Sequence, residues 1–203
     1  MIIAGAGGHA KEILTELQWL DYEKPICFFD NTTGAKDTLF DWPVLHNEQS
    51  VQKEMTRDKN FIIGVGTPAT RESLYWQLVA LGAVPYSLLS RYAYIGHSEI
   101  VLGDGLNVMA GVIITASITI GKGTLVHAHC SIHHDSLIGE FCELSPGCRI
   151  LGRVNIGNST SIGTNAVLLP GISIGNYVKI GAGAIVTKNV PDGVTVKGVP
   201  GRW

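Results

Sequence analysis

Residues 150–180 read ILGRVNIGNSTSIGTNAVLLPGISIGNYVKI, and an aliphatic side chain stands at every sixth position of this stretch. The same spacing continues on both sides without a slip, through Leu102, Val108, Ile114, Ile120, Val126, Ile132, Ile138, Leu144, Ile150, Ile156, Ile162, Leu168, Ile174, Ile180 and Val186. A period of six fits neither an α-helix, with about 3.6 residues per turn, nor one long alternating strand. A fixed hexapeptide repeat is typical of a parallel β-helix, and we predict this fold for the second half of the chain.

The residues around the aliphatic positions indicate how each coil closes. Four positions after the aliphatic, the side chain is usually small or β-branched, as at Cys130, Cys142 and Cys148. We expect each hexad to form one short strand and a turn, with three hexads in a triangular coil and the aliphatic side chain inside. Glycine often follows the aliphatic directly, as in Ile120-Gly121, and we interpret it as accommodating the positive φ of a tight corner. We interpret the three cysteines as packing residues rather than ligands.

The composition reflects this repeat. Glycine accounts for 25 of the 203 residues, above the average share of about 7%, and charged residues make up only 16%, below the usual share of about 25%. Eighteen of the glycines lie after residue 95, so the excess belongs mainly to the repeat. The apolar share of 45% excludes a disordered chain. A net charge of -2 offers no basic surface, so we expect no nucleic-acid partner.

The cysteines and the first residues of the chain indicate the cellular compartment. The four cysteines include no close CxxC pair, which is typical neither of a disulfide framework nor of a zinc site. The first residues show no secretory signal, and no uncharged apolar run is long enough to span a membrane. We therefore expect a cytoplasmic protein without a membrane span.

The first half is typical of an α/β domain, because short apolar strands alternate with segments of helical apolar spacing. We expect a parallel sheet with strands at Met1–Ala4, Pro25–Phe29, Asn60–Val65 and Val84–Leu89, and helices at Lys11–Leu20 and Ala69–Leu81. The boundary is placed near Ser90–Ile95. This gives a Rossmann-like domain over residues 1–92 and a β-helix with a C-terminal tail over residues 93–203.

A glycine turn joins the first strand to the first helix. Gly5-x-Gly7-x-x-Ala10 fits the dinucleotide-binding fingerprint, and Asp30 follows Ala10 at the distance of about 20 residues where the fingerprint places its acidic residue. Backbone amides at the helix N-terminus would hold a phosphate, although a plain strand–helix turn has the same spacing. A full dinucleotide fold needs two such halves, and about 90 residues provide one. We therefore expect a single nucleotide diphosphate rather than NAD.

A cluster of histidines is the candidate for chemistry: His127, His129, His133 and His134, followed by Asp135. Zinc binding is one interpretation, but His127 and His133 hold the same hexad position on successive faces and point apart within one chain. The other interpretation is a general base at His134, with Asp135 fixing its tautomer and stabilising the imidazolium. Gly152 lies three hexads on, one coil away, and its N–H could donate to a developing oxyanion. A solvated surface histidine fits the spacing equally well.

Several motifs together resemble a known family. They are Gly5-Ala6-Gly7-Gly8-His9-Ala10-Lys11, Phe29-Asp30, Gly64-Val65-Gly66-Thr67 with Arg71, Ser131-Ile132-His133-His134-Asp135-Ser136-Leu137-Ile138-Gly139, and the tail Val186-Thr187-Lys188-Asn189-Val190-Pro191 to Gly198-Val199-Pro200. Over essentially its whole length, the chain resembles the bacterial sugar-nucleotide acetyltransferases of the sialic acid O-acetyltransferase-like group. That group includes the UDP-4-amino-sugar N-acetyltransferases of glycan assembly.

The resemblance implies a left-handed β-helix, a homotrimer with active sites at subunit interfaces, and acetyl-CoA as acetyl donor without a metal. His134 matches the general base of the family and Asp135 its acidic partner, where many relatives carry Glu. Gly152 matches the backbone donor to the thioester carbonyl, and Glu143 holds a position where some relatives place a histidine near acetyl-CoA. Thr164, Ala182 and Lys188 match the strip along which the cofactor lies.

The resemblance also implies a pocket for a nucleotide-linked amino sugar. Its matching residues are Gly7, Gly8, His9, Asp30, Asn31 and Gly66; relatives often carry two acids where this chain has Asp30-Asn31. The expected reaction is direct N-acetylation of the sugar amine. The alternatives are O-acetylation of a sialic acid or other sugar, a β-helix zinc lyase, and a non-catalytic nucleotide-binding scaffold.

Overall fold

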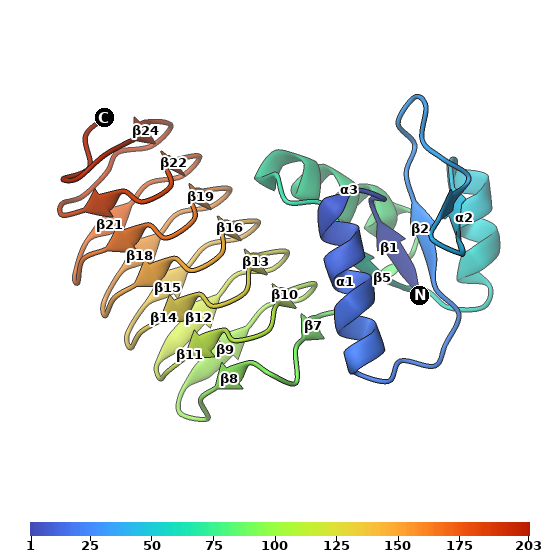
Figure 1. Ribbon diagram of the computed structural model, residues 1–203, viewed down its shortest axis with the longest axis horizontal. Coiled ribbons are helices and arrows are strands. Elements are labelled where there is room, and N and C mark those ends of the chain that lie inside the picture. The colour runs from blue at the N-terminus through green and yellow to red at the C-terminus, as the bar shows by residue number, and fades with distance from the viewer.

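The computed structural model describes residues 1–203 and shows an α/β part beside a long stack of coils (Figure 1). The α/β part holds one sheet of six strands, in the order β3-β4-β2-β1-β5-β6. All neighbouring strands are parallel except β3 and β4. The strands are β1 (Ile2–Ala4), β2 (Cys27–Phe29), β3 (Thr38–Leu39), β4 (Trp42–Leu45), β5 (Asn60–Ile63) and β6 (Val84–Pro85).

Three helices accompany this sheet: α1 (Gly8–Trp19), α2 (Glu48–Met55) and α3 (Pro68–Ala80). Helix α1 buries Ile13, Leu14 and Leu17, the apolar stripe that predicted it. Helix α3 starts on Pro68, whose missing N–H costs nothing in a first turn. Neither α2 nor the β3–β4 hairpin was expected from the sequence. No helix in the chain combines the length and apolar character needed to cross a bilayer.

The second part is a parallel β-helix, as predicted. Its three faces are a seven-stranded, a six-stranded and a five-stranded sheet. The seven-stranded sheet holds β7 (Leu88–Leu89), β10 (Asn107–Val108), β13 (Leu125–Val126), β16 (Glu143–Leu144), β19 (Ser161–Ile162), β22 (Lys179–Ile180) and β24 (Thr195–Val196). The six-stranded sheet holds β8 (Tyr94–Ile95), β11 (Ile113–Ile114), β14 (Ser131–Ile132), β17 (Arg149–Ile150), β20 (Val167–Leu168) and β23 (Ile185–Val186). The five-stranded sheet holds β9 (Ile100–Leu102), β12 (Ile118–Ile120), β15 (Leu137–Ile138), β18 (Asn155–Ile156) and β21 (Ser173–Ile174).

Strand pairing confirms three hexads per coil. Ile132 pairs with Ile114 on one side and Ile150 on the other, a step of three hexads in each direction. The aliphatic row forms one continuous core inside the coils. Cys130, Cys142 and Cys148 are fully buried in this core and are not in disulfides, which confirms their interpretation as packing residues.

The corners differ from the sequence-based interpretation. Positive φ occurs three residues after the aliphatic, for example at Asp135 (φ 60) and Arg153 (φ 60), and not at the glycine that follows the aliphatic. That glycine has a different cause: a Cβ at Gly121 would lie 2.6 Å from the amide nitrogen of Glu140 in the next coil. Close stacking of the coils therefore selects glycine there.

The segment Val84–Leu89 bears on where the two parts of the chain divide. The sequence analysis placed Val84–Leu89 in the first sheet as one strand, but the structure splits this segment. Strand β6 pairs with β5 in the α/β sheet, whereas β7 pairs with β10 in the β-helix. We therefore propose that the β-helix domain begins before Leu88.

Neighbouring residues on one strand test the inside–outside assignment. Ile156 is 1% exposed, and Asn155 beside it faces outward. We expect Ile156→Ala to lower the free energy of unfolding by about 2–5 kcal/mol, because it leaves a cavity in the core. Asn155→Ala should change it by no more than about 0.5 kcal/mol. Urea unfolding followed by circular dichroism measures both, and equal losses would contradict the assignment.

Candidate active site

Two rows of turns carry the candidate functional residues of the β-helix. We call the turns from the seven-stranded to the six-stranded sheet the first edge, and those from the six-stranded to the five-stranded sheet the second edge. Residues three hexads apart stack along one edge, as the pairing register requires. His134, Gly152 and Lys188 follow β14, β17 and β23 and so share the second edge.

The geometry at His134 leaves one of its two ring nitrogens free. Its Nδ1 lies 2.8 Å from the Asp135 carboxylate, which can only accept, so the neutral ring carries its proton on Nδ1. Nε2 then holds a free lone pair. The ring lies against Gly152, where an added Cβ would come within 2.6 Å of Nε2. His134 is 54% exposed, so a substrate can reach it.

Gly152 supplies a free donor at the same place. Its carbonyl accepts from the Gly171 amide at 3.0 Å, but its own N–H donates to no protein group. The structure therefore brings together His134, Asp135 and Gly152 as the three-hexad spacing predicted. When a nucleophile attacks a carbonyl group, a lone pair such as that of His134 can accept its proton, and an amide such as that of Gly152 can donate to the oxyanion.

The other residues expected to bind the cofactor are divided between surfaces. Thr164 and Ala182 follow β19 and β22 and are exposed on the first edge. Glu143 is outward on the seven-stranded sheet, where Ser145 donates to it at 2.7 Å and burial raises the pKa of its carboxyl. One chain therefore does not bring Thr164 and Ala182 together with His134.

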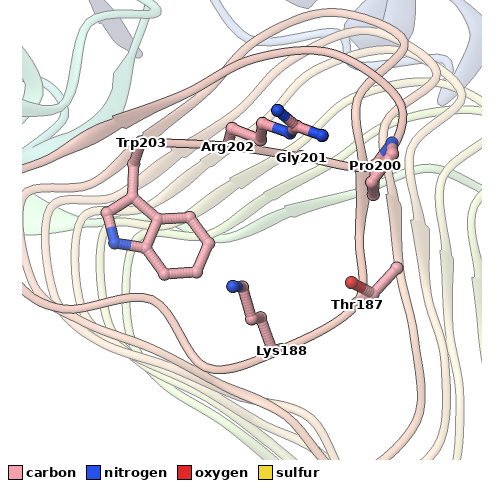
Figure 2. Close-up of a pocket in the computed structure, with 6 residues that line it drawn as sticks. All are labelled: Thr187, Lys188, Pro200, Gly201, Arg202 and Trp203. Atoms are coloured by element: carbon pink, nitrogen blue, oxygen red, sulfur yellow. The ribbon is translucent and has the colours of Figure 1, made fainter.

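Lys188 lies beside a cavity of about 600 Å³ at the far end of the coils. Figure 2 shows Thr187, Lys188, Pro200, Gly201, Arg202 and Trp203 around it. The Lys188 ammonium lies 5.2 Å from the centre of the Trp203 ring. Two cationic side chains and an exposed indole offer partners for an anionic group with an aromatic ring. Arg202 and Trp203 were not expected from the sequence.

The expected nucleotide site lies at the carboxyl ends of β2, β1 and β5. Gly7 caps α1, and Gly7, Gly8 and Gly66 have open space where a side chain would stand. Helix α1 begins at Gly8, so its first amides lack partners within the helix. Asp30 follows β2, the neighbour of β1, and Asn31 beside it is exposed. The structure thus brings all of these to one end of the sheet, and the His9 side chain turns from there toward the β-helix.

A cavity of about 280 Å³ opens beside Asp30. Lys11 and Lys36 line it, and neither was among the expected binding residues. Lys11 stands one turn into the helix that follows the glycine turn. Asp30 accepts from the Thr32 hydroxyl at 2.6 Å and its amide at 3.0 Å, which fixes its carboxylate.

The His9 side chain lies at the junction with the β-helix. Arg71 is fully buried there and donates to the carbonyls of Gly123 at 2.9 Å and Val65 at 2.6 Å. Burial lowers its pKa to about 9. Asn107, on β10, lies 3.5 Å from Arg71 through Oδ1, and its Nδ2 donates to the Ile63 carbonyl at 3.0 Å. These contacts fix which end of the Asn107 amide faces His9.

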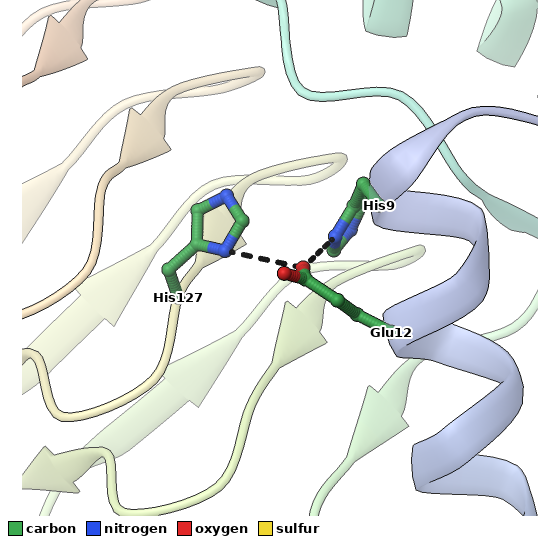
Figure 3. A group of neighbouring side chains, drawn as sticks. All are labelled: His9, Glu12 and His127. Atoms are coloured by element: carbon green, nitrogen blue, oxygen red, sulfur yellow. Dashed lines mark hydrogen bonds and ion pairs between the residues drawn. The ribbon is translucent and has the colours of Figure 1, made fainter.

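The junction continues into the group His9, Glu12 and His127 (Figure 3). Asn107 Nδ2 lies 3.2 Å from His9 Nε2 and donates to it, so His9 carries its proton on Nδ1 and donates to Glu12 at 3.0 Å. His127 reaches the same Glu12 oxygen at 3.7 Å and Glu143 at 3.6 Å. Burial lowers the pKa of His127 to about 4, with nearby His9 adding to the shift.

The spacing of this group would admit a metal ion, since one ligand atom from each residue lies within 4.8 Å of the others. The direction of the hydrogen bond between Asn107 and His9 argues against a metal ion here. A metal on His9 Nδ1 would move the proton to Nε2, where it would face the amide donor of Asn107. The four histidines of the alternative zinc interpretation are divided between edges, because His127 and His129 lie on the first edge, and His133 and His134 on the second.

The fold and the comparisons with known proteins define an acyltransferase of the hexapeptide-repeat class. Residues 1–78 match the PglD N-terminal domain, and residues 153–188 match the bacterial transferase hexapeptide of six repeats. The chain is similar to the bacterial hexapeptide-repeat transferases and, over its first 78 residues, to proteins that carry this N-terminal domain. Its β-helix is accordingly left-handed.

Three solved structures match almost the whole chain. WeeI from Acinetobacter baumannii AYE is 29% identical, with 100% of this chain and 99% of that chain covered and a TM-score of 0.91. PerB from Caulobacter crescentus, in complex with CoA and GDP-perosamine, is 27% identical, with 99% and 95% covered and a TM-score of 0.90. The acetyltransferase domain of PglB from Neisseria gonorrhoeae FA1090, in complex with acetyl coenzyme A, is 27% identical, with 99% and 97% covered and a TM-score of 0.89.

The buried His127 predicts a pH dependence of stability. Its pKa falls from 6.5 to about 4 in the folded chain, so between these values the unfolded chain binds the extra proton. The free energy of unfolding should therefore decrease as the pH falls through this window, by up to about 1.4 kcal/mol per pH unit. His127→Gln should flatten this slope, whereas His97→Gln, at the surface, should not. Equal slopes for both variants in urea unfolding would contradict the assignment.

Proposed function

We propose that this protein is an acetyl-CoA-dependent N-acetyltransferase that acts on the amino group of a nucleotide-linked amino sugar. The observation that carries the proposal is the His134–Asp135 pair lying against Gly152, with a free lone pair and a free amide. The similar PerB structure holds CoA and GDP-perosamine, and the similar PglB domain holds acetyl coenzyme A. The PerB complex supports CoA chemistry on a nucleotide amino sugar, and the PglB complex supports acetyl coenzyme A as the donor.

His134 acts as general base in a direct transfer that forms no acyl-enzyme. The sugar amine attacks the thioester carbonyl carbon, and Nε2 takes the proton that the amine loses as the C–N bond forms. The C–S bond then breaks, and the imidazolium returns the proton to the departing CoA thiolate. Asp135 holds the ring and stabilises the imidazolium. Cys130 takes no part as a nucleophile, because it is fully buried in the core.

Gly152 stabilises the oxyanion of the tetrahedral intermediate through its free amide. Thr164, Ala182, Glu143 and Lys188 contact acetyl-CoA, and the glycine turn with Gly66, Asp30 and Asn31 holds the nucleotide. His9 contributes to that site by fixing its neighbour Glu12 and not by a free ring nitrogen, since both of its nitrogens are engaged.

The working unit is a homotrimer with active sites between subunits. Thr164 and Ala182 lie on the first edge and His134 on the second, so one chain cannot present them to the same cofactor. Outward apolar side chains support association: Tyr94 and Ile113 on the six-stranded sheet, and Val101 and Leu137 on the five-stranded sheet, are 44–68% exposed. The four free cysteines fit a cytoplasmic location.

An acetyl-transfer screen tests the function. Purified protein is incubated with acetyl-CoA and UDP-, dTDP- or GDP-linked amino sugars, and free CoA is measured. We expect turnover with a member of this panel. Turnover with free sialic acid alone would establish the O-acetyltransferase alternative, and no turnover together with stoichiometric zinc would favour the lyase.

Removing the base should abolish most of the activity. His134→Ala is expected to lower kcat by about 10²–10⁴-fold, the usual contribution of a general base. Because the side chain is half exposed, the fold should be retained. Steady-state kinetics with the best substrate of the screen measures the loss, and kcat near that of the wild type would remove His134 from the role.

Gly152→Ala offers a second test with a different cause. The new Cβ would overlap the His134 ring, while the backbone at Gly152 needs no left-handed conformation. Displacing the base by about 1 Å can reduce the rate by about 10²-fold. We expect kcat to fall by this order with an unchanged melting temperature. Full activity of Gly152→Ala would show that the His134 ring does not act as the base from its position against Gly152.

A further inference from the structure

A third cavity lies between α1 and the first edge, and Glu12 and His127, two members of the group in Figure 3, line it. Its volume is about 310 Å³, and its lining is Glu12, Thr15, Glu16, Trp19, Met109, Ala110, His127, Ala128, His129 and Pro146. Two carboxylates and no lysine or arginine contribute to this lining. The cavity therefore favours a cationic group, with Trp19 and Met109 offering apolar surface beside it.

Hydrogen bonds from the junction between the α/β part and the β-helix hold Glu12 in place. The chain of donors runs from buried Arg71 through Asn107 to His9, and His9 donates to the Glu12 carboxylate at 3.0 Å. This hydrogen bond lowers the pKa of Glu12, so the side chain remains an anion. Glu12 is nevertheless 56% exposed, and a ligand in the cavity can reach it. His127 beside it is neutral and does not compete as a cation.

Glu16 gives an independent indication of a ligand. It is only 3% exposed, and one carboxylate oxygen accepts from the Ala110 amide at 2.9 Å. The other oxygen is buried without any partner. Buried polar atoms without a partner are uncommon and costly. Glu16 lines the cavity, and a donor bound there would satisfy this oxygen once the side chain turns toward it.

The cavity lies between the expected position of the nucleotide phosphate and the expected cofactor strip. Glu12 stands four positions after Gly8, which is about 6 Å along the helix from the expected phosphate position. One sugar ring spans about this distance. Ala110, Ala128 and Pro146 precede Thr164 and Ala182 in steps of one coil along the first edge, the expected cofactor strip.

We propose that this cavity receives the sugar ring of the acceptor and that Glu12 binds its ammonium group, which makes the site selective for an amine over a hydroxyl acceptor. The proposal rests on the proposed function and adds the residue that selects the acceptor. Attack requires the neutral amine. The bound ammonium therefore releases one proton to solvent, and His134 of another copy accepts the second during acetyl transfer.

The test compares two ligands in wild type and Glu12→Gln. The ligands are the amino sugar nucleotide identified by the screen and its analogue with a hydroxyl in place of the amine. Glutamine can still accept from His9, so the variant removes the charge and keeps the local hydrogen bond. We expect wild type to bind the amine about 10–100-fold more tightly by calorimetry and the variant to lose this preference, the usual loss for one charged hydrogen bond.

Glu23→Gln is the matched control, because it makes the same change at an exposed site outside the cavity. It should keep the wild-type preference, and both variants should keep the KM for acetyl-CoA. Retained amine preference in Glu12→Gln, alongside wild-type turnover of the amino sugar, would overturn the cavity proposal and leave the function standing. Wild type without turnover of any amino sugar would overturn the function itself. Stoichiometric zinc that is lost in Glu12→Gln would identify a metal site instead.

Discussion

The return of the chain to the same face after every three hexads is the constraint on which the rest of the structure depends. Each coil must place its aliphatic residue directly over the one below, as Ile114, Ile132 and Ile150 do. This leaves every turn at one of three edges. His134 therefore stands next to Gly152, while Thr164 and Ala182 stand along another edge. The same regularity that builds the core divides the chemistry between two surfaces of one subunit.

The α/β part depends on a different interaction, the burial of Arg71. A guanidinium without a carboxylate partner is costly to bury, and here carbonyl oxygens from both parts of the chain satisfy it. Because Gly123 belongs to the β-helix and Val65 to the end of β5, the contact fixes how the two parts meet. Through Asn107 and His9, it also sets the direction of each hydrogen bond leading to Glu12.

The repeat and the pairing of His134 with Gly152 were predictable, because both follow from a period that is written in consecutive residues. The glycine turn, with α1 after it, was predictable from local spacing as well. The roles of Asn107 and His127 were not, since they arise where the α/β part packs on the seven-stranded sheet. Packing between segments that lie far apart in the sequence leaves no periodic signal. Helix α2 carries too few apolar residues to show a pattern, and the strands of the β3–β4 hairpin are too short, at two and four residues.

The stacked coils also fix the distance between residues on the same edge. His134 and Lys188 lie on the same edge, separated by three coils, and neighbouring parallel strands are about 4.8 Å apart. The distance from the reacting group to the far cavity is therefore about 14 Å along the edge. It can change only in whole coils, because any other insertion would rotate one of the two residues onto a different face. In a fold of this kind, the spacing between two binding positions on one edge is therefore always a whole number of coils, which limits the length of an extended cosubstrate that fits both.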